Sequence, residues 1–477
     1  GYKNIPYRTS IGYTNQDGIL KTTNMERTTL AIGADPTLFD NHLKISVNLK
    51  GSYTKQNFGD QGAVGSAVFY DPTQPVKNGN TKFGGYYTWV NLSDVLPDGS
   101  MDPNGSPNPI GVSNPVALLE QTDNRSTVKR SLGNVTFDYK FHFLPELRAN
   151  LNLGYDYFTT TGHNNSPDNA AFTFRNGIGR KNDYEQTGKS QLLDFYLNYV
   201  KELPSIQSKL DITGGYSWQY FYKDGWSFVR NGDGTQVSVD KKTSKFINEN
   251  YLVSFFGRMN YTLKDRYLFT FTLRDDGSSR FSSDNRWGLF PAAAFAWKIN
   301  DESFLKNVSA VSDMKLRLGW GVTGQQDIGN DYPYLAVYRG STPTAQYQFG
   351  NTFYNTLRPN PYDANIKWEE TTTYNVGLDF GFLKNRITGT VDVYKRKTKD
   401  LLNFIPIAAG SNFSNFLTTN VGNLENKGFE VSLTGQVISK KDMSWSVGVN
   451  AAYNENKITK LTKTDDPNYP GVDAGLI

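Results

Sequence analysis

The chain has 477 residues; Phe, Tyr and Trp make up 14% of them, and charged residues only 20%. Length alone suggests about three domains. Lys and Arg exceed Asp and Glu by four without forming a basic stretch, so no nucleic-acid partner is predicted. The lack of cysteine excludes disulfides, thiolate metal sites and cysteine nucleophiles. The longest nearly apolar run, residues 289–297, is too short for a transmembrane helix, which needs ~18 residues.

Strands with two chemically different faces are predicted from the start of the chain. The first covers residues 7–14 and turns at residues 15–18. Further along, apolar and polar residues alternate with a period of two, which is typical of strands. This alternation covers residues 147–157, 210–220, 374–382, 429–437 and 445–454. No stretch of comparable length has a helical period, and one short helix is predicted near residues 301–308.

Short and long connections alternate between the predicted strands. The short turns lie at residues 39–42, 142–146, 203–207, 264–266, 383–385 and 439–442, with a longer turn at 300–312. The long polar loops lie at residues 55–126, 162–188, 223–245, 323–367 and 397–427. The strands between them have about 10–14 residues, more than the ~5–6 that are typical of soluble sheets.

The alternation of loop lengths favours one architecture. A soluble β-sandwich or propeller also has two-faced strands, but it does not require every second loop to be long. A transmembrane barrel has long strands, short turns on one side and long loops on the other, and its closed sheet pairs every backbone group in lipid. We therefore predict an all-β fold, a large transmembrane antiparallel β-barrel of which this chain is an incomplete stretch. Seven hairpins and the first strand make fifteen strands, and residues 334–354 are a candidate for a further pair.

The chain offers little for catalysis. Its densest charged cluster lies at residues 275–286; a glycosidase-like or cation site is one interpretation, and a tight Asp-Gly turn with compensating arginines at a barrel rim is the favoured one. The three histidines, His42, His142 and His163, are far apart in sequence. A phosphate-binding loop, a G-x-S-x-G elbow and an H-E-x-x-H motif are missing from the sequence. We predict no enzyme activity, no cofactor and no metal site.

Aromatic residues in the long loops are the candidate substrate contacts. Rings beside Asn, Asp and Thr can stack on sugar faces or hold a peptide, and they can equally pack a loop onto the barrel or onto a partner subunit. The candidates are Tyr86, Tyr87, Trp89, Tyr347 and Phe349.

Several segments, in order along most of the chain, resemble the SusC/RagA-like TonB-dependent outer-membrane transporters of the Bacteroidetes. They are SIGYTNQDGILK at 10–21, LRDDGSSRF at 273–281, NRWGLFP at 285–291, LRLGWGVTGQQ at 316–326, NVGLD at 375–379, DVYK at 392–395 and NKGFE at 426–430. The resemblance implies a 22-stranded barrel with an N-terminal plug and a TonB box. It also implies a SusD-like surface lipoprotein as partner and uptake of oligosaccharides or peptides driven by TonB, ExbB and ExbD.

On this resemblance the chain, residues 1–477, is expected to be part of one barrel in the outer-membrane lipid, with the N-terminal plug and C-terminal strands absent. Alternation places polar side chains toward the lumen, namely Asn150, Asp156, Asp211, Asn375 and Asp379. Two alternatives to an importer stay open: a structural or adhesive outer-membrane barrel without active transport, and a secreted carbohydrate-active enzyme built on a sandwich or solenoid.

Overall fold

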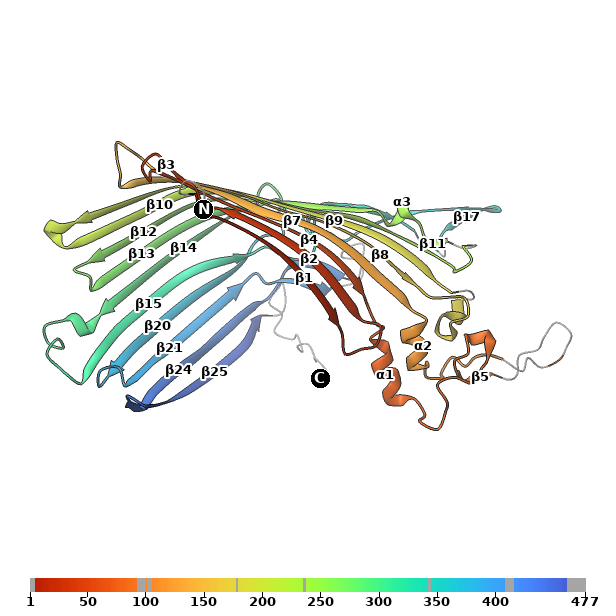
Figure 1. Cartoon of the computed structure of the whole chain (residues 1–477). Coiled ribbons are helices and arrows are strands. Elements are labelled where there is room, and N and C mark those ends of the chain that lie inside the picture. Colours follow the sequence, from red (N-terminus) through yellow and green to blue (C-terminus); the bar gives the residue numbers. More distant parts are fainter. Residues whose placement is uncertain are drawn as a thin grey trace. The chain divides into compact units, whose positions relative to one another are not determined.

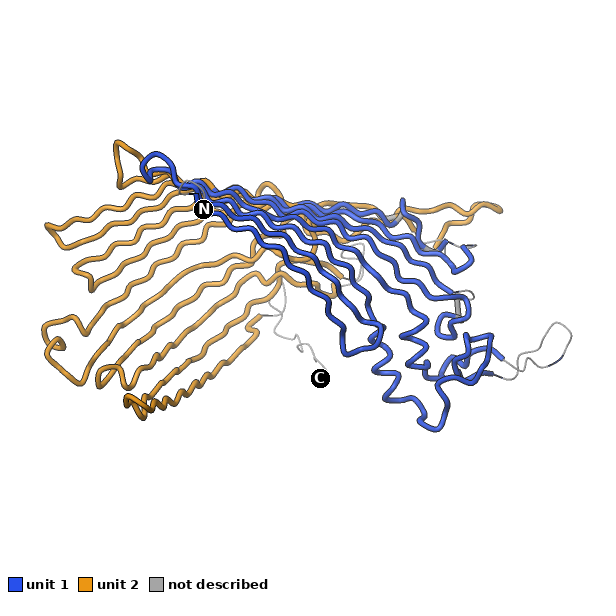
Figure 2. Tube along the Cα trace, in the orientation of Figure 1, with its two compact units in different colours: residues 1–137, 152–192, 220–249 blue, residues 138–151, 193–219, 250–477 orange. Residues whose placement is uncertain are grey.

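A computed structural model describes residues 5–91, 100, 105–176, 179–234, 237–341, 345–407 and 416–460 (Figure 1). The chain divides into two compact units, which are coloured separately in Figure 2. Unit 1 consists of residues 1–137, 152–192 and 220–249, and unit 2 consists of residues 138–151, 193–219 and 250–477.

Fifteen strands of eleven or more residues form the framework of the described part of the chain, which confirms the all-β prediction and its strand count. They are β1 (Tyr7–Asp17), β2 (Asn24–Ala34), β4 (Leu43–Asn57), β7 (Asp123–Lys140), β8 (Leu147–Asn165), β9 (Lys181–Leu203), β10 (Ser208–Arg230), β12 (Phe246–Leu263), β13 (Tyr267–Ser278), β14 (Trp287–Lys298), β15 (Val311–Gln325), β20 (Glu369–Phe382), β21 (Ile387–Lys399), β24 (Asn423–Lys440) and β25 (Met443–Lys460).

The remaining elements are short. The helices are α1 (Gly62–Phe69), α2 (Pro115–Glu120) and α3 (Lys241–Ser244), with 3-10 turns η1 (Thr81–Phe83), η2 (Ala171–Asn176), η3 (Pro204–Ile206) and η4 (Ile299–Asp301). The short strands are β3 (Thr37–Leu38), β5 (Val90–Asn91), β6 (Ser106–Pro107), β11 (Val237–Val239), β16 (Tyr338–Gly340), β17 (Tyr347–Phe349), β18 (Thr352–Tyr354), β19 (Leu357–Pro359), β22 (Leu402–Pro406) and β23 (Phe416–Asn420). Within the described residues no helix has the length and apolarity needed to cross a bilayer.

The tight turns between paired strands rely on left-handed backbone. Lys264 and Asp265 have φ of 51° and 53°, and Leu383, Lys384 and Asn385 have φ of 54°, 60° and 59°. Two or more successive positive φ values match the right-handed twist of a hairpin, as in type I′ turns. These turns therefore occur where the sequence predicts short connections.

The strands are longer than their apolar alternation predicts. β9 and β10 have 23 residues each, against the 10–14 expected, and the connection between β8 and β9 shrinks to residues 166–180. The strand ends are polar, so the sequence pattern marks them as loop. Their backbones nevertheless stay extended, as the bridge between Ser166 and Arg180 beyond the strand ends shows.

Each unit consists of consecutive antiparallel pairs. In unit 1, β2 pairs with β1 and with β4. In unit 2, β12 to β15 and then β20, β21, β24 and β25 pair in chain order. Residues 338–359 do not add a long pair, because β16 pairs only with β19 and β17 only with β18 in the described ladders.

One face of these strands exposes large apolar side chains. In β13, which is paired on both sides, Phe271 is 47% exposed and Leu273 is 51% exposed. In β20, Tyr374 and Val376 are each 50% exposed. Soluble proteins rarely expose so continuous an apolar face, whereas a lipid-facing barrel wall requires one.

A small apolar core in unit 2 lies under the loops instead of between sheets. Phe281, Phe290, Ile366 and Trp368 are buried together, and Trp368 Nε1 donates to the backbone carbonyl of Arg286 at 2.9 Å. This core joins the β13–β14 connection to the residues that precede β20, so the loops have their own packing.

Candidate substrate-binding cavity

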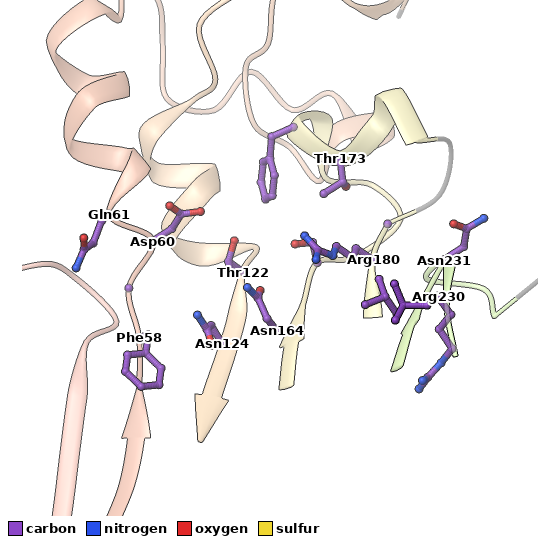
Figure 3. Close-up of a pocket in the computed structure, with 16 residues that line it drawn as sticks. Phe58, Asp60, Gln61, Thr122, Asn124, Asn164, Thr173, Arg180, Arg230 and Asn231 are labelled. Carbon is purple, nitrogen blue, oxygen red and sulfur yellow. The ribbon is translucent and has the colours of Figure 1, made fainter. Parts of the chain in front are cut away.

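A cavity of about 1020 Å³ lies at the loop end of the unit 1 strands (Figure 3). The strands β7, β8, β10 and β11 and the turn η2 contribute lining residues, together with the segment between β4 and α1 and the residues just before β9. Its labelled lining residues are Phe58, Asp60, Gln61, Thr122, Asn124, Asn164, Thr173, Arg180, Arg230 and Asn231. Amides, hydroxyls and a few charges around two apolar rings, Phe58 and Phe172, form the kind of lining that binds a polar ligand.

Backbone hydrogen bonds fix the cavity walls. The Phe58 N–H donates to the carbonyl of Asn124 at 2.8 Å, and the N–H groups and carbonyls of Ser166 and Arg180 exchange bonds of 2.8 and 2.9 Å. Asp60 Oδ1 accepts from the Gly62 N–H at 2.8 Å, which orients its carboxylate at the start of α1. The cavity is therefore carried by rigid strand ends.

Two oxygens beside the cavity lack a partner among the described residues. Thr122 Oγ1, on a lining residue, and Oε1 of the adjacent Gln121 are buried without a hydrogen bond. A buried polar group without a partner costs about 1–3 kcal/mol, so these positions favour a ligand or water that supplies hydroxyl or N–H groups.

The two cationic lining residues differ in their partners. Arg230 Nη1 donates to Asp183 Oδ2 at 2.9 Å, and its guanidinium carbon lies 4.8 Å from the Phe228 ring centroid. Arg180 is exposed. Arg230 is therefore fixed in the wall, and Arg180 has the freedom to turn toward a ligand.

The loop beside the cavity is held by one carboxylate, Glu120 at the end of α2. Glu120 forms an ion pair with Lys21, accepts a hydrogen bond from the Tyr86 hydroxyl, and lies 3.6 Å from Lys77 Nζ. The Lys21 hydrogen bond, followed by that of Tyr86, lowers the pKa of Glu120 to about 2. Burial and the bond to Glu120 raise the pKa of Tyr86 to about 12.

The predicted loop aromatics separate into two settings. Tyr86 is only 7% exposed, with Lys77 Nζ 4.7 Å from its ring centroid. Trp89 packs edge-to-face against Tyr87 at 5.0 Å and against Tyr70 at 5.4 Å. Tyr86 and Tyr87 also line a second hollow of about 170 Å³. These three candidates are part of a packed loop, and their contact with substrate stays a prediction.

Tyr347 and Phe349 belong to the β17–β18 hairpin of unit 2. They are 57% and 64% exposed, and their rings lie 4.6 Å apart. The hairpin presents them to solvent, and a ligand role for them stays a prediction.

The five residues predicted to face the lumen are polar strand residues with varied surroundings. Asp156 forms an ion pair with Arg130, Asp211 accepts from Asn198 Nδ2 at 2.7 Å, and Asp379 binds Lys315 at 2.7 Å and Arg317 at 2.8 Å. Asn375 borders a shallow hollow over the small residues of β14 and β15, and Asn150 is half-buried in β8. Wall stabilisation accounts for the three aspartates, and their lumen role stays a prediction.

The charged cluster at residues 275–286 has a structural setting. Asp276 is within β13, bonded to Arg274 Nε at 2.7 Å, and Arg280 Nε donates to Asp331 at 3.1 Å. The favoured Asp-Gly turn is wrong in its position, because β13 continues to Ser278 and the connection follows it. In the described residues no group of three His, Asp or Glu side chains is placed to hold a metal ion.

Sequence reasoning missed the cavity residues themselves. Asn124 lies at the start of β7, Asn164 near the end of β8 and Arg180 directly before β9, so they are separated by up to 56 positions. Their shared signal is that each lies within a predicted long loop, at residues 55–126 or 162–188.

Long strands with one lipid-compatible face, joined by long loops on one side, define the class of outer-membrane β-barrel proteins. The model of the family described as TonB dependent receptor-like, beta-barrel, matches residues 69–475. The chain belongs to this family of outer-membrane proteins.

Two curated relatives agree with this assignment. The chain is 44% identical to the TonB-dependent receptor SusC of Bacteroides thetaiotaomicron, over 100% of this chain and 48% of SusC. It is 31% identical to the TonB-dependent receptor P3 of Formosa agariphila, over 98% of this chain and 45% of P3. The SusC/RagA-like resemblance is thus confirmed, and the chain spans about half the length of the curated relatives it matches.

Solved structures show the same fold. The RagAB peptide transporter matches with a TM-score of 0.74 at 21% identity, covering 98% of this chain and 51% of that chain. The ferripyoverdine receptor of the Pseudomonas aeruginosa outer membrane matches with a TM-score of 0.54 at 11% identity, covering 96% of this chain and 53% of that chain.

Proposed function

We propose that the full-length protein imports oligosaccharides or oligopeptides across the outer membrane, and that the unit 1 cavity captures the substrate. The observation that carries this proposal is the polar cavity of about 1020 Å³ formed by strand ends on the long-loop side. Its unpartnered Thr122 hydroxyl suits a ligand rich in hydroxyl or N–H groups, which both substrate classes are.

The comparisons support transport over catalysis. The relatives are named TonB-dependent receptors, and the RagAB structure is titled a peptide transporter. Import in this form needs a plug, a TonB box, further strands, TonB with ExbB and ExbD, and a SusD-like lipoprotein. We assign the first three to the rest of the full-length protein and the others to separate partners. The chain itself is proposed to act by binding and conducting, without catalysis.

The described residues suit successive steps of such a path. Asn124, Asn164 and Arg180 would hold the substrate at the loop side by amide and guanidinium hydrogen bonds. Polar strand residues such as Asp156 and Asp379, whose charges are neutralised by neighbouring cations, would then keep the lumen wall hydrated without a strong trap for the substrate.

The experiment is uptake by cells that express the full-length protein, with labelled oligosaccharides and oligopeptides offered in parallel. Thr122→Val, which removes only the hydroxyl, should weaken substrate binding about tenfold while leaving the free protein as stable or slightly more stable, since an unpaired polar group is lost. Asn403→Ala, on an exposed asparagine of unit 2, is the control. Absent uptake by a correctly inserted protein would refute import and favour a structural or adhesive barrel, whereas TonB-independent uptake would refute only the coupling to TonB.

A further inference from the structure

The outward face of unit 1 carries lysines and tyrosines in alternation where the apolar band ends. Lys55 Nζ lies 5.9 Å from the Tyr53 ring centroid on β4. Lys189 Nζ on β9 lies 6.0 Å from the Tyr157 centroid on β8 and 5.1 Å from the Tyr222 centroid on β10. Each lysine is exposed and is held by aromatic rings at cation–π distance.

Lys129 of β7 belongs to the same row. Ser131 Oγ lies 2.8 Å from Tyr155 Oη, so the odd-numbered positions of β7 share the face of Tyr155. Lys129 lies two residues nearer the long loops than Ser131, and Tyr157 lies two residues nearer the long loops than Tyr155. Lys129 is therefore at the level of Tyr157, between Tyr53 of β4 and Tyr157 of β8. We call the set Lys55, Lys129, Lys189, Tyr53, Tyr157 and Tyr222 the basic belt.

The depth of the belt follows from the strand geometry. On β4 the outward positions from Leu43 to Tyr53 are apolar or glycine, and Lys55 comes next. At a rise of ~3.3 Å per residue and a strand tilt of ~40°, these ten residues cover a height of ~25 Å along the membrane normal. This equals the height of the apolar band in outer-membrane barrels. The belt therefore lies at the headgroup level of the leaflet on the long-loop side.

The belt has excess positive charge over β4, β7 and β8. None of its three lysines forms an ion pair within the described part of the chain. The outward positions of β4, β7 and β8 carry a single acidic residue, Asp123 at the start of β7, which is paired with Arg125 at 2.6 Å. At the β10 end of the belt, Glu249 accepts a hydrogen bond from Tyr220 at 3.0 Å, and Asp224 is hydrogen-bonded to Tyr222. The outward face of β9 also carries Glu185 and Asp183, and Asp183 is paired with Arg230 at 2.9 Å.

We infer that the basic belt binds the phosphate groups of lipids in the outer leaflet of the outer membrane. Ammonium groups at headgroup depth, spaced over neighbouring strands, match phosphates on a lipid surface, and the tyrosines suit the interface because one end is apolar and the other wet. This inference rests on the outer-membrane location and does not depend on import.

The test compares lipid binding by delipidated full-length protein in detergent, using purified lipopolysaccharide and the same preparation after enzymatic removal of its phosphates. The variant K55Q/K129Q/K189Q should lose affinity for the phosphorylated form by about fivefold per lysine, on the order of 100-fold in all, since each lysine near an anionic surface contributes to binding. The control K44Q/K50Q changes lysines on the opposite face of β4 and should bind normally.

Heat-dependent migration in detergent gels verifies that each variant is folded. Equal binding of phosphorylated and dephosphorylated lipid by the wild type, or unchanged affinity in the folded triple variant, would overturn the inference. Substrate uptake measured on the same variants separates the two proposals, because loss of lipid binding leaves import intact.

Discussion

Glu120→Gln is expected to release the loop beside the cavity. The substitution keeps the side-chain size but removes the charge that Lys21 and Lys77 share. The pKa of Glu120, lowered from 4.5 to about 2, corresponds to about 3 kcal/mol. Because Lys21 is 63% exposed and Glu120 is 27% exposed, solvent screening reduces the contribution to about 1–2 kcal/mol.

The sign of the pH dependence follows from that shift. The folded pKa is lower than the unfolded one, so the stabilisation is complete above about pH 5 and is lost as the pH falls toward 2. Tyr86 behaves oppositely: its pKa is raised from 10.0 to about 12, so its contribution is complete below pH 10 and is lost between about pH 10 and 12.

Amide hydrogen exchange of the full-length protein measures the effect locally. At pH 7, peptides from residues 58–91 and 105–121 should exchange about 5–30-fold faster in Glu120→Gln than in the wild type, the ratio that 1–2 kcal/mol implies. After correction for intrinsic rates, acid should accelerate the wild type but not the variant. Glu26→Gln, on an exposed residue of β2, is the control. Equal exchange at pH 7, or the same acid response in both proteins, would refute the role of Glu120.

Three further predictions concern unit 2 and are made for the full-length protein. In Gly377→Ala, the new β-carbon would lie 2.6 Å from Arg317 Cζ and should displace the guanidinium from its ion pairs with Asp379 and Asp392. The free energy of unfolding should fall by about 1–3 kcal/mol, between the values of exposed and buried ion pairs. Chemical denaturation in lipid measures this change. Trp368→Ala should cost about 3–5 kcal/mol and speed hydrogen exchange in residues 279–286. The double variant Tyr347→Ala/Phe349→Ala should weaken binding of substrate or of a lipoprotein partner without changing the melting temperature.

Each of these predictions has a matched comparison. Arg317→Met should reproduce the loss in Gly377→Ala, because both separate the guanidinium from Asp379 and Asp392; a neutral result in both variants would contradict the argument. Phe353→Ala, in the same loop region as Trp368 but 58% exposed, should leave exchange unchanged. A melting temperature lowered in the Tyr347 and Phe349 double variant would show that these rings pack in the fold.

The sequence predicted the framework well because strand alternation is a local property. A residue and its neighbour two positions away lie on the same face, so Phe271 and Leu273 could be assigned to one face without knowledge of any other strand. The tight turns were predictable for a related reason, since residues such as Asp265 and Asn385 tolerate left-handed backbone. The strand ends were underestimated because hydrogen bonding continues where the apolar face stops.

The candidate site was harder to predict because it depends on contacts that are distant in sequence. Tyr86 reads as an available loop aromatic, but Glu120, 34 positions away, bonds its hydroxyl and the loop buries its ring. Thr122 gives no signal in the sequence, and only the structure shows that its hydroxyl is buried beside a cavity without a partner. Residue type indicates which contacts a side chain can make, and the register of the strands decides which it does make.

The two unit 1 features make different demands on the same strands. β4, β7, β8, β9 and β10 carry the basic belt on one face and reach the polar cavity at their loop ends. Lipid contact at the belt limits how far these strands can tilt, because lysines moved ~5 Å deeper would enter the apolar band, where charge is costly. A substrate-induced movement of the cavity is therefore expected to occur in the loop held by Glu120, not in the strands. Slow exchange in β8 with and without substrate, beside fast and substrate-sensitive exchange in residues 105–121, is the result that this reasoning requires.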